Sequence, residues 1–373
     1  MGLPDCADGA IGMTMTAQLS DALLLNNGTE LKNRFMLAPL TNLQSGADGV
    51  LSDDEYRWLT YRAEGGFGLT MTCAASVQHS GVGFPGQLGA HDDRHITGLT
   101  RLADGIKAHH SHAVVQLQHS GMRAQPDYCS GVPQCPSDDE ETGSKAMSDD
   151  QVKALIDDFI AAADRCQKAG FDGVELHGAH GYLLSEFLSP QYNQREDHYG
   201  GDAERRAKIL WEVIAGVNER CGRGFSLGVR LSPERFGQRT AEIRDLAAAL
   251  LLDQRLDYLD MSLWDLAKPA HDEAFQGQSL LDIFAGLPRD GVALGAAGKL
   301  YGAAQCQQAL DQGLDFIMVG RAGIVHHDFP QRAFADPEFV MADLPVTREH
   351  LTQERLSPTF IDYMATWKGF VSD

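Results

Sequence analysis

The sequence predicts an α/β fold, a (β/α)8 TIM barrel, and three observations support this. Apolar runs with strand character alternate with amphipathic helical stretches, the pattern of a parallel α/β fold. Eight such pairs can be counted between residues 34 and 324, which matches the size of a (β/α)8 barrel. Several runs are apolar on both faces, as strands covered by helices should be. A doubly wound open sheet is the alternative fold.

The eight strand candidates follow one another along the chain at Arg34–Leu40, Gly68–Val77, Ala113–His119, Gly173–Ala179, Phe225–Ser232, Tyr258–Trp264, Val292–Gly298 and Phe316–Ile324. The stretch 149–169 carries apolar residues at three-and-four spacing and is a clear helix candidate. Ser148 with Gln151, and Ser52 with Glu55, form the pattern of a capping box at a helix start. These signals fix where two of the helices begin.

The chain divides into three parts by its pattern. Residues 1–20 form an expected flexible N-terminus, 21–335 the barrel, and 336–373 an extension that packs on the barrel or on a neighbouring subunit of a homo-oligomer. Asn26-Asn27-Gly28 lies between two apolar segments, which indicates a hairpin that plugs the bottom of the barrel. The long irregular segments 120–147 and 181–202 are expected to cover a site, because long loops in compact domains are usually functional or disordered.

Composition excludes several classes of partner. With 52 acidic against 31 basic residues, the net charge of −21 argues against nucleic acid or an anionic membrane as a partner. No apolar run approaches the roughly 20 residues that span a bilayer, so a cytoplasmic protein that binds small molecules is expected. Seven dispersed cysteines suggest neither a disulfide framework nor a zinc ribbon.

Three side chains that can donate hydrogen bonds or a proton lie at the C-terminal end of the fourth strand candidate. They are His177, His180 and Tyr182, at the strand end where a barrel exposes residues to a ligand. Two imidazoles can polarise a carbonyl oxygen, and a phenol can protonate the carbon beside it. Half a metal site is an alternative, but the H-E-x-x-H arrangement is missing and no metal is expected. Satisfied core histidines are the other alternative. His326-His327, by contrast, is expected on the solvated surface.

The stretch 171–201 resembles the Old Yellow Enzyme family of FMN-dependent ene-reductases, and the resemblance extends over most of the chain from about residue 31. The residues at the family's spacing are Leu188-Ser189-Pro190, Asn193, Arg195, Asp197, Tyr199-Gly200-Gly201 and Arg206. This resemblance implies that His177 and His180 hold a substrate carbonyl and that Tyr182 is the proton donor.

The same resemblance implies an FMN site at the strand ends. Pro39, Leu40 and Thr41 would lie beneath the flavin, with the Thr41 hydroxyl donating toward it. Ala74 would contact the flavin edge, and Gln116 its pyrimidine side. These five positions are ordinary strand-end residues when taken alone.

Arg230 is a stronger signal, because a charge inside an apolar run is costly to bury unless it is paired. The resemblance places it against the flavin, where a cation would stabilise the reduced form. A core ion pair with an acid such as Asp260 is the alternative. Gly298, Gly320 and Arg321 follow the last two strands, where barrels commonly bind phosphate, and are expected to hold the FMN phosphate. Tight turns that need glycine are the alternative there.

The expected activity is transfer of hydride from NADH or NADPH, through FMN, to the activated C=C bond of an α,β-unsaturated carbonyl compound. The string Gly81-Val82-Gly83-Phe84-Pro85-Gly86 satisfies G-x-G-x-x-G, but no amphipathic helix follows it. Without a separate nicotinamide domain, reductant and oxidant would use one pocket in ping-pong turnover. Alternatives are oxidative demethylation of a small amine, a non-enzymatic flavin-binding barrel, and a barrel lyase, which the lack of lysine in the strand candidates disfavours.

Overall fold

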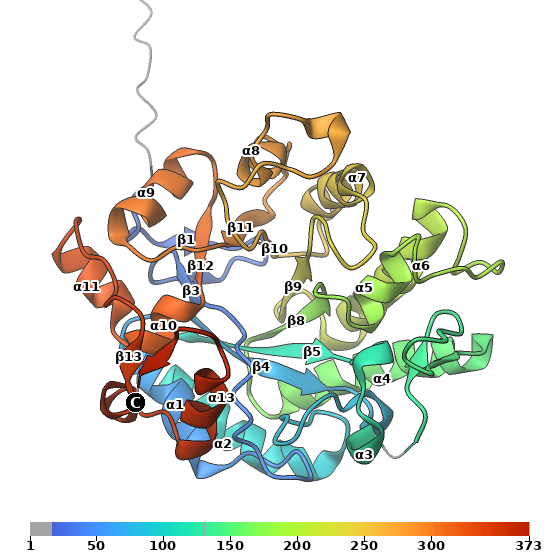
Figure 1. Cartoon of the computed structure of the whole chain (residues 1–373), viewed down its shortest axis with the longest axis horizontal. Coiled ribbons are helices and arrows are strands. Elements are labelled where there is room, and N and C mark those ends of the chain that lie inside the picture. Colours follow the sequence, from blue (N-terminus) through green and yellow to red (C-terminus); the bar gives the residue numbers. More distant parts are fainter. Residues whose placement is uncertain (1–16, 130, 373) are drawn as a thin grey trace, which may run out of the picture.

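Eight parallel strands close into a barrel with helices around it, as Figure 1 shows for the computed structural model, which describes residues 17–129 and 131–372. Around the barrel the order is β10-β11-β12-β3-β4-β5-β8-β9. The barrel strands are β3 Phe35–Leu37, β4 Leu69–Ser76, β5 His112–Gln118, β8 Gly173–Gly178, β9 Ser226–Leu231, β10 Tyr258–Ser262, β11 Ala293–Ala297 and β12 Phe316–Val319. The closed order confirms the predicted TIM barrel and excludes the open sheet.

Helices follow the strands and cover the outside of the barrel. The helices of the described residues are α1 Asp53–Glu64, α2 Ile96–Lys107, α3 Pro126–Cys129, α4 Asp149–Lys168, α5 Leu183–Leu188, α6 Ala203–Cys221, α7 Thr240–Leu251, α8 Leu280–Ala285, α9 Ala303–Asp311, α10 Arg321–Val325, α11 Phe329–Ala335, α12 Arg348–Gln353 and α13 Pro358–Ala365. Short strands outside the barrel are β1 Leu23–Leu24, β2 Glu30–Leu31, β6 Gln134–Cys135, β7 Lys145–Ala146, β13 Val346–Thr347 and β14 Val371–Ser372.

Two strand predictions ended at least three residues too late. β3 stops at Leu37, and the Ala38 amide makes one more bond, to the Val319 carbonyl at 3.0 Å; Pro39 then has no N–H with which to continue the ladder. β12 ends at Val319 because Gly320 turns away with φ −98° and ψ −98°, and residues predicted as strand form α10 instead. An apolar run cannot by itself reveal where a strand changes into a helix.

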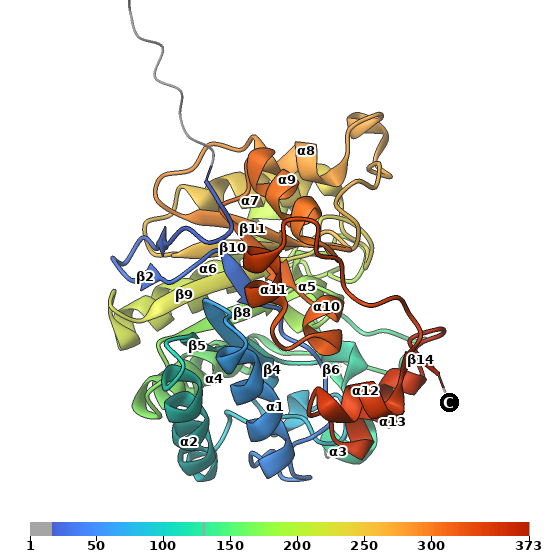
Figure 2. The same cartoon turned by 90° about the vertical axis from the view of Figure 1, so that its left-hand side faces the viewer.

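The bottom of the barrel is closed by the predicted hairpin. β1 pairs antiparallel with β2, and Leu25 and Leu31 are buried against residues from inside the barrel. Figure 2 shows β2 at one end of the barrel and α13 toward the other. Inside, aromatic rings pack against glycine: a Cβ on Gly295 would lie 2.1 Å from the Phe316 ring. Large side chains fill the bottom of the barrel, so the site forms at the top, at the C-terminal ends of the strands.

The two predicted capping boxes differ in the structure. Ser148 and Gln151 form a complete box at the start of α4. Ser52 caps α1 by accepting the Glu55 amide, but the Glu55 side chain does not return to the cap. It is buried and accepts from Asn42 at 3.0 Å, and it also contacts Ser45. Glu55 therefore fastens the loop after β3, which carries Thr41, to α1.

The segment after α11 lies against the barrel. Phe360 in α13 packs edge-on against Trp58 of α1, with ring centroids 5.3 Å apart. At the other terminus, residues 1–16 of the expected flexible segment lie outside the described residues, whereas Leu19 is buried and its amide donates to Gln307. Among the described helices, none has the length and apolar character needed to cross a bilayer.

Candidate active site

His177, His180 and Tyr182 come together at the end of β8. The His177 ring centroid lies 5.0 Å from that of His180 and 5.2 Å from that of Tyr182. His177 is on the strand itself, His180 has a left-handed backbone with φ 63°, and Tyr182 precedes α5. His180 Nε2 lies 2.7 Å from the Ser262 hydroxyl at the end of β10. His177 Nδ1 is buried and bonds to none of the described residues.

Both imidazoles are held in their neutral form. Burial lowers the pKa of His177 well below its ordinary value, and the charges of His180 and Arg230 add to this effect. Burial likewise lowers the pKa of His180, with Arg230 and Arg123 contributing. Burial raises the pKa of Tyr182, so its phenol keeps its proton at neutral pH. The three groups can therefore donate hydrogen bonds and one proton without carrying charge.

A buried network of charged and polar groups lies beside these side chains. Strand register places Arg230 of β9 next to His177 on one side and Asp260 of β10 on the other. Arg230 Nε is 2.8 Å from Asp260 Oδ2, so the ion pair considered from the sequence is present. Gln116 donates to Glu175 Oε1 at 2.7 Å, which makes it a buried amide with a carboxyl partner. Burial, and then the charge of Asp260, raise the pKa of Glu175.

Most of the residues predicted to bind the flavin or its phosphate line a cavity beside these groups. The residues on its wall that the sequence singled out are Pro39, Leu40, His180, Arg230, Gly298, Gly320 and Arg321. Trp264 and Trp367 also line it, and the Arg321 guanidinium lies 5.6 Å from the Trp367 ring. Trp367 was missed because the chain after residue 335 shows no periodic pattern that connects it to the barrel.

Thr41, Ala74 and Gln116 do not line this cavity. Ala74 of β4 pairs in register with Gln116 of β5, and β5 in turn pairs with β8, the strand that carries His177. The Thr41 hydroxyl forms no hydrogen bond with another described residue. The glycines also differ: a Cβ on Gly298 would lie 2.4 Å from the end of the Leu266 side chain and 3.0 Å from the Leu266 amide nitrogen, so close packing favours glycine there. One on Gly320 would meet nothing nearer than Leu40, at 3.9 Å.

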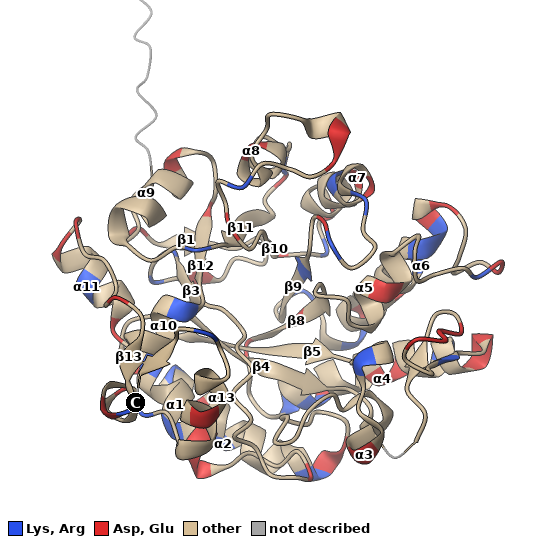
Figure 3. Cartoon of the chain, viewed as in Figure 1, with Lys and Arg blue, Asp and Glu red and all other residues tan. Residues whose placement is uncertain are grey.

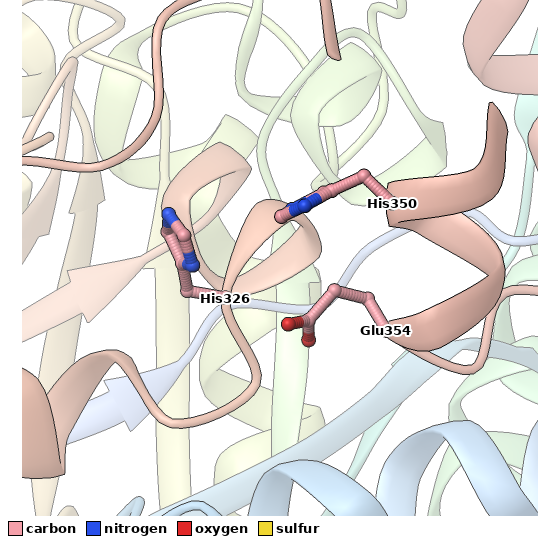
Figure 4. A group of neighbouring side chains, drawn as sticks. All are labelled: His326, His350 and Glu354. Carbon is pink, nitrogen blue, oxygen red and sulfur yellow. The ribbon is translucent and has the colours of Figure 1, made fainter. Parts of the chain in front are cut away.

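His326, His350 and Glu354 form a cluster between α10 and α12, drawn in Figure 4. The prediction that His326 is solvated was wrong, since 7% of it is exposed. One possible ligand atom from each residue lies within 4.8 Å of the others. His326 Nε2, however, accepts the Ala342 amide at 3.0 Å, so the neutral ring carries its proton on Nδ1. That tautomer leaves no free lone pair on His326, which disfavours a metal site; its Nδ1–H has no hydrogen-bond acceptor among the described residues.

Glu354 ties the C-terminal segment to the barrel. It accepts the His327 amide at 2.7 Å, and its backbone carbonyl accepts from Arg62 at 2.7 Å. We expect Glu354→Gln to lower the free energy of unfolding at pH 7 by about 1.5–3 kcal/mol, the scale of a hydrogen bond to a charged group. Urea denaturation measures this change. Glu349→Gln is the matched control, because Glu349 is exposed in the helix that Glu354 follows, α12.

The stability lost on Glu354→Gln should depend on pH in a defined direction. Hydrogen bonds from His327 and the charge of Arg62 outweigh burial and hold the folded pKa of Glu354 below its ordinary value. Its ionised form therefore stabilises the fold above the unfolded pKa of about 4.3, and this contribution disappears as the pH falls through the folded value. The difference between wild type and Glu354→Gln should shrink below about pH 4. A difference that grows on acidification would contradict this account.

Comparison with known proteins places this geometry in a family. The model of the NADH:flavin oxidoreductase / NADH oxidase family matches residues 23–336. The probable NADH-dependent flavin oxidoreductase YqiG of Bacillus subtilis is 34% identical over 82% of this chain and 85% of its own length. An NADPH dehydrogenase of Bacillus pumilus is 35% identical over 82% of this chain and 91% of its own. The Old Yellow Enzyme homologue of Zymomonas mobilis has a TM-score of 0.77 and 26% identity, covering 90% of this chain and 96% of its own.

The chain belongs to the NADH:flavin oxidoreductase / NADH oxidase family. Within it, the protein is an NAD(P)H-dependent flavin oxidoreductase of the Old Yellow Enzyme type, with FMN as its cofactor. The residues present fit that cofactor. His177 Nδ1 is buried without a hydrogen-bond partner among the described residues, and the backbone at Gly320 is open to a ligand.

Proposed function

We propose that this enzyme reduces the C=C bond of α,β-unsaturated carbonyl compounds, with NADH or NADPH as the source of electrons. The observation that carries the proposal is the grouping of two neutral imidazoles and one protonated phenol at the end of β8. Neutral N–H groups can hold a carbonyl oxygen and strengthen their bonds as negative charge develops on it. A nearby phenol can protonate the adjacent carbon.

In this proposal FMN is held by groups from several strand ends. Pro39, Leu40 and Thr41 would support the ring system from the loop after β3. Ala74 and Gln116 would contact its edge, and Arg230 its pyrimidine side. Gly298, Gly320 and Arg321 would take the phosphate. When bound, the cofactor supplies a two-electron carrier that accepts a hydride from the nicotinamide and gives it to the alkene.

The chain's own residues then orient the substrate and move one proton. His177 and His180 hold the carbonyl oxygen, and Ser262 fixes the His180 tautomer: if its hydroxyl donates to Nε2, then Nδ1–H is free to bind the substrate. Tyr182 donates its phenolic proton to the α-carbon. Positioning is the main contribution, because hydride transfer needs the reacting carbon within about 3–3.5 Å of its donor.

Reductant and alkene use the same pocket in turn, in this proposal. Initial rates measured over a grid of NADPH and 2-cyclohexenone concentrations test this order. We expect parallel lines in double-reciprocal plots, because the nicotinamide product leaves before the alkene binds. Lines that intersect would show that both substrates are bound together and would contradict the ping-pong scheme.

A further inference from the structure

Two arginines near His180 and Tyr182 have no acidic partner among the described residues. The side chains of Arg123 and Arg235 are exposed, and neither forms an ion pair with any described residue. Arg123 lies 5.0 Å from the Phe236 ring and 5.7 Å from the Tyr182 ring. Arg235 lies 4.5 Å from the Trp264 ring. Both cations are thus held over aromatic faces and leave their N–H groups available to a ligand.

These arginines surround the catalytic side chains. The His180 ring centroid lies 6.4 Å from that of Phe236 and 6.1 Å from that of Trp264, the two rings on which the arginines rest. The charge of Arg123 reaches His180, whose pKa it helps to lower, and Tyr182, where it opposes the effect of burial. An anion bound by Arg123 would therefore lie close to a carbonyl held by His180.

Glu186, an acid on which the charge of Arg123 acts, forms no ion pair with it. Glu186 is buried in α5, and its carboxyl accepts the Met122 amide at 2.8 Å. Burial raises its pKa well above the ordinary value, so its neutral form is favoured. In Figure 3, basic segments lie at β9 and α10, and acidic and basic segments both occur on the outer helices. The two unpaired arginines thus lie beside the site of a protein whose net charge is −21.

The loops that present these groups are fixed in strained conformations. Arg235, Phe236 and Trp264 have left-handed backbones, with φ of 68°, 50° and 63°. Such conformations are costly for residues other than glycine and persist where the surroundings hold them, often at binding sites. Phe236 packs on Gly181, where an added Cβ would lie 2.9 Å from the ring. The cations are therefore placed beside the site by the fold.

We propose that the oxidising substrate carries a carboxylate in addition to its carbonyl-activated alkene, and that Arg123 binds this carboxylate with Arg235 as a second cation. The inference rests on the proposed function and adds the charge class of the substrate. A guanidinium binds a carboxylate in a bidentate, charge-assisted manner. The phosphates of NAD(P)H are a second source of anionic groups, and the test separates the two.

The test compares one alkene with and without the charge. The probes are (E)-4-oxopent-2-enoate and its methyl ester, which share the ketone-activated double bond. We expect the wild-type holoenzyme to reduce both, and Arg123→Gln to lower the ratio of kcat/KM for acid over ester by about 10- to 100-fold, as loss of a charged hydrogen bond predicts. Arg235→Gln should lower it less. Arg244→Gln, an exposed arginine on α7, should leave both rates unchanged.

Equilibrium binding gives a second readout that needs no turnover. The saturated analogue 4-oxopentanoate should perturb the visible spectrum of the oxidised holoenzyme, with a Kd that rises by the same factor in Arg123→Gln. An equal loss for acid and ester would overturn the inference, since it would indicate a merely structural role. So would slower flavin reduction by NAD(P)H with an unchanged acid-to-ester ratio, because the anion would then be the dinucleotide phosphate. If the wild type reduces neither probe, the proposed function fails and this inference with it.

Discussion

Tyr182→Phe should keep its bound FMN and its reduction by NADPH, yet reduce alkenes about 10²- to 10⁴-fold more slowly, the range that general acid catalysis contributes. The substitution removes the phenolic proton and leaves the ring beside His177 in place. Rapid-mixing measurements of the two half-reactions separate the effects. The first half-reaction needs no proton from Tyr182, whereas the second requires one at the α-carbon.

The matched control is Tyr61→Phe, which removes a hydroxyl from a tyrosine that stacks on His327 away from the site. It should leave both half-reactions unchanged. If Tyr182→Phe reduces the alkene at the wild-type rate, Tyr182 does not donate the proton and a solvent route must replace it. If the first half-reaction slows as well, the substitution has disturbed the pocket rather than the proton transfer.

Arg230→Met should weaken both the fold and the binding of FMN. Asp260 is fully buried, and Arg230 is its ion-pair partner at 2.8 Å. Removing one partner of a buried ion pair costs about 3–5 kcal/mol, because the other charge is left uncompensated. Urea denaturation of the apoprotein measures the stability loss, and the ratio of bound FMN to protein measures the cofactor loss.

The double variant Arg230→Met/Asp260→Asn separates these two roles. Replacing the Asp260 carboxylate, which Arg230→Met leaves unpaired, should restore much of the stability, since this charge is then absent from the core. FMN binding should remain weak, because the cation that faces the cofactor is still missing. Recovery of FMN affinity in the double variant would show that Arg230 serves only to balance Asp260.

The sequence was sufficient for the parts of this protein whose physics is local. Eight alternating units predicted the barrel, and burying a charge inside an apolar strand is costly enough to single out Arg230. Glu175 carries the same signal in the strand before His177 and could have been found in this way. The grouping of His177, His180 and Tyr182 at the end of β8 was also predictable, because the three lie within six residues of one another.

The parts that depend on contacts between distant segments were not predictable. The change from strand to helix at Gly320 follows from backbone torsions that the apolar pattern does not encode. Trp367 reaches the cavity from the C-terminal segment, and no periodicity links it to Arg321. The role inferred for Arg123 and Arg235 depends on the aromatic rings against which they pack, and these rings come from separate loops. Only the three-dimensional structure reveals that neither arginine has an acidic partner in the part of the chain that it describes.

The most direct test of the account is the visible spectrum of the purified protein under anaerobic conditions. NADPH is added first, followed by 2-cyclohexenone. We expect the yellow flavin absorbance to bleach with NADPH and to return in full with the enone, which would demonstrate both halves of the proposed reaction. A protein that bleaches but keeps its reduced spectrum when the enone is added would contradict the claim that this site reduces activated alkenes.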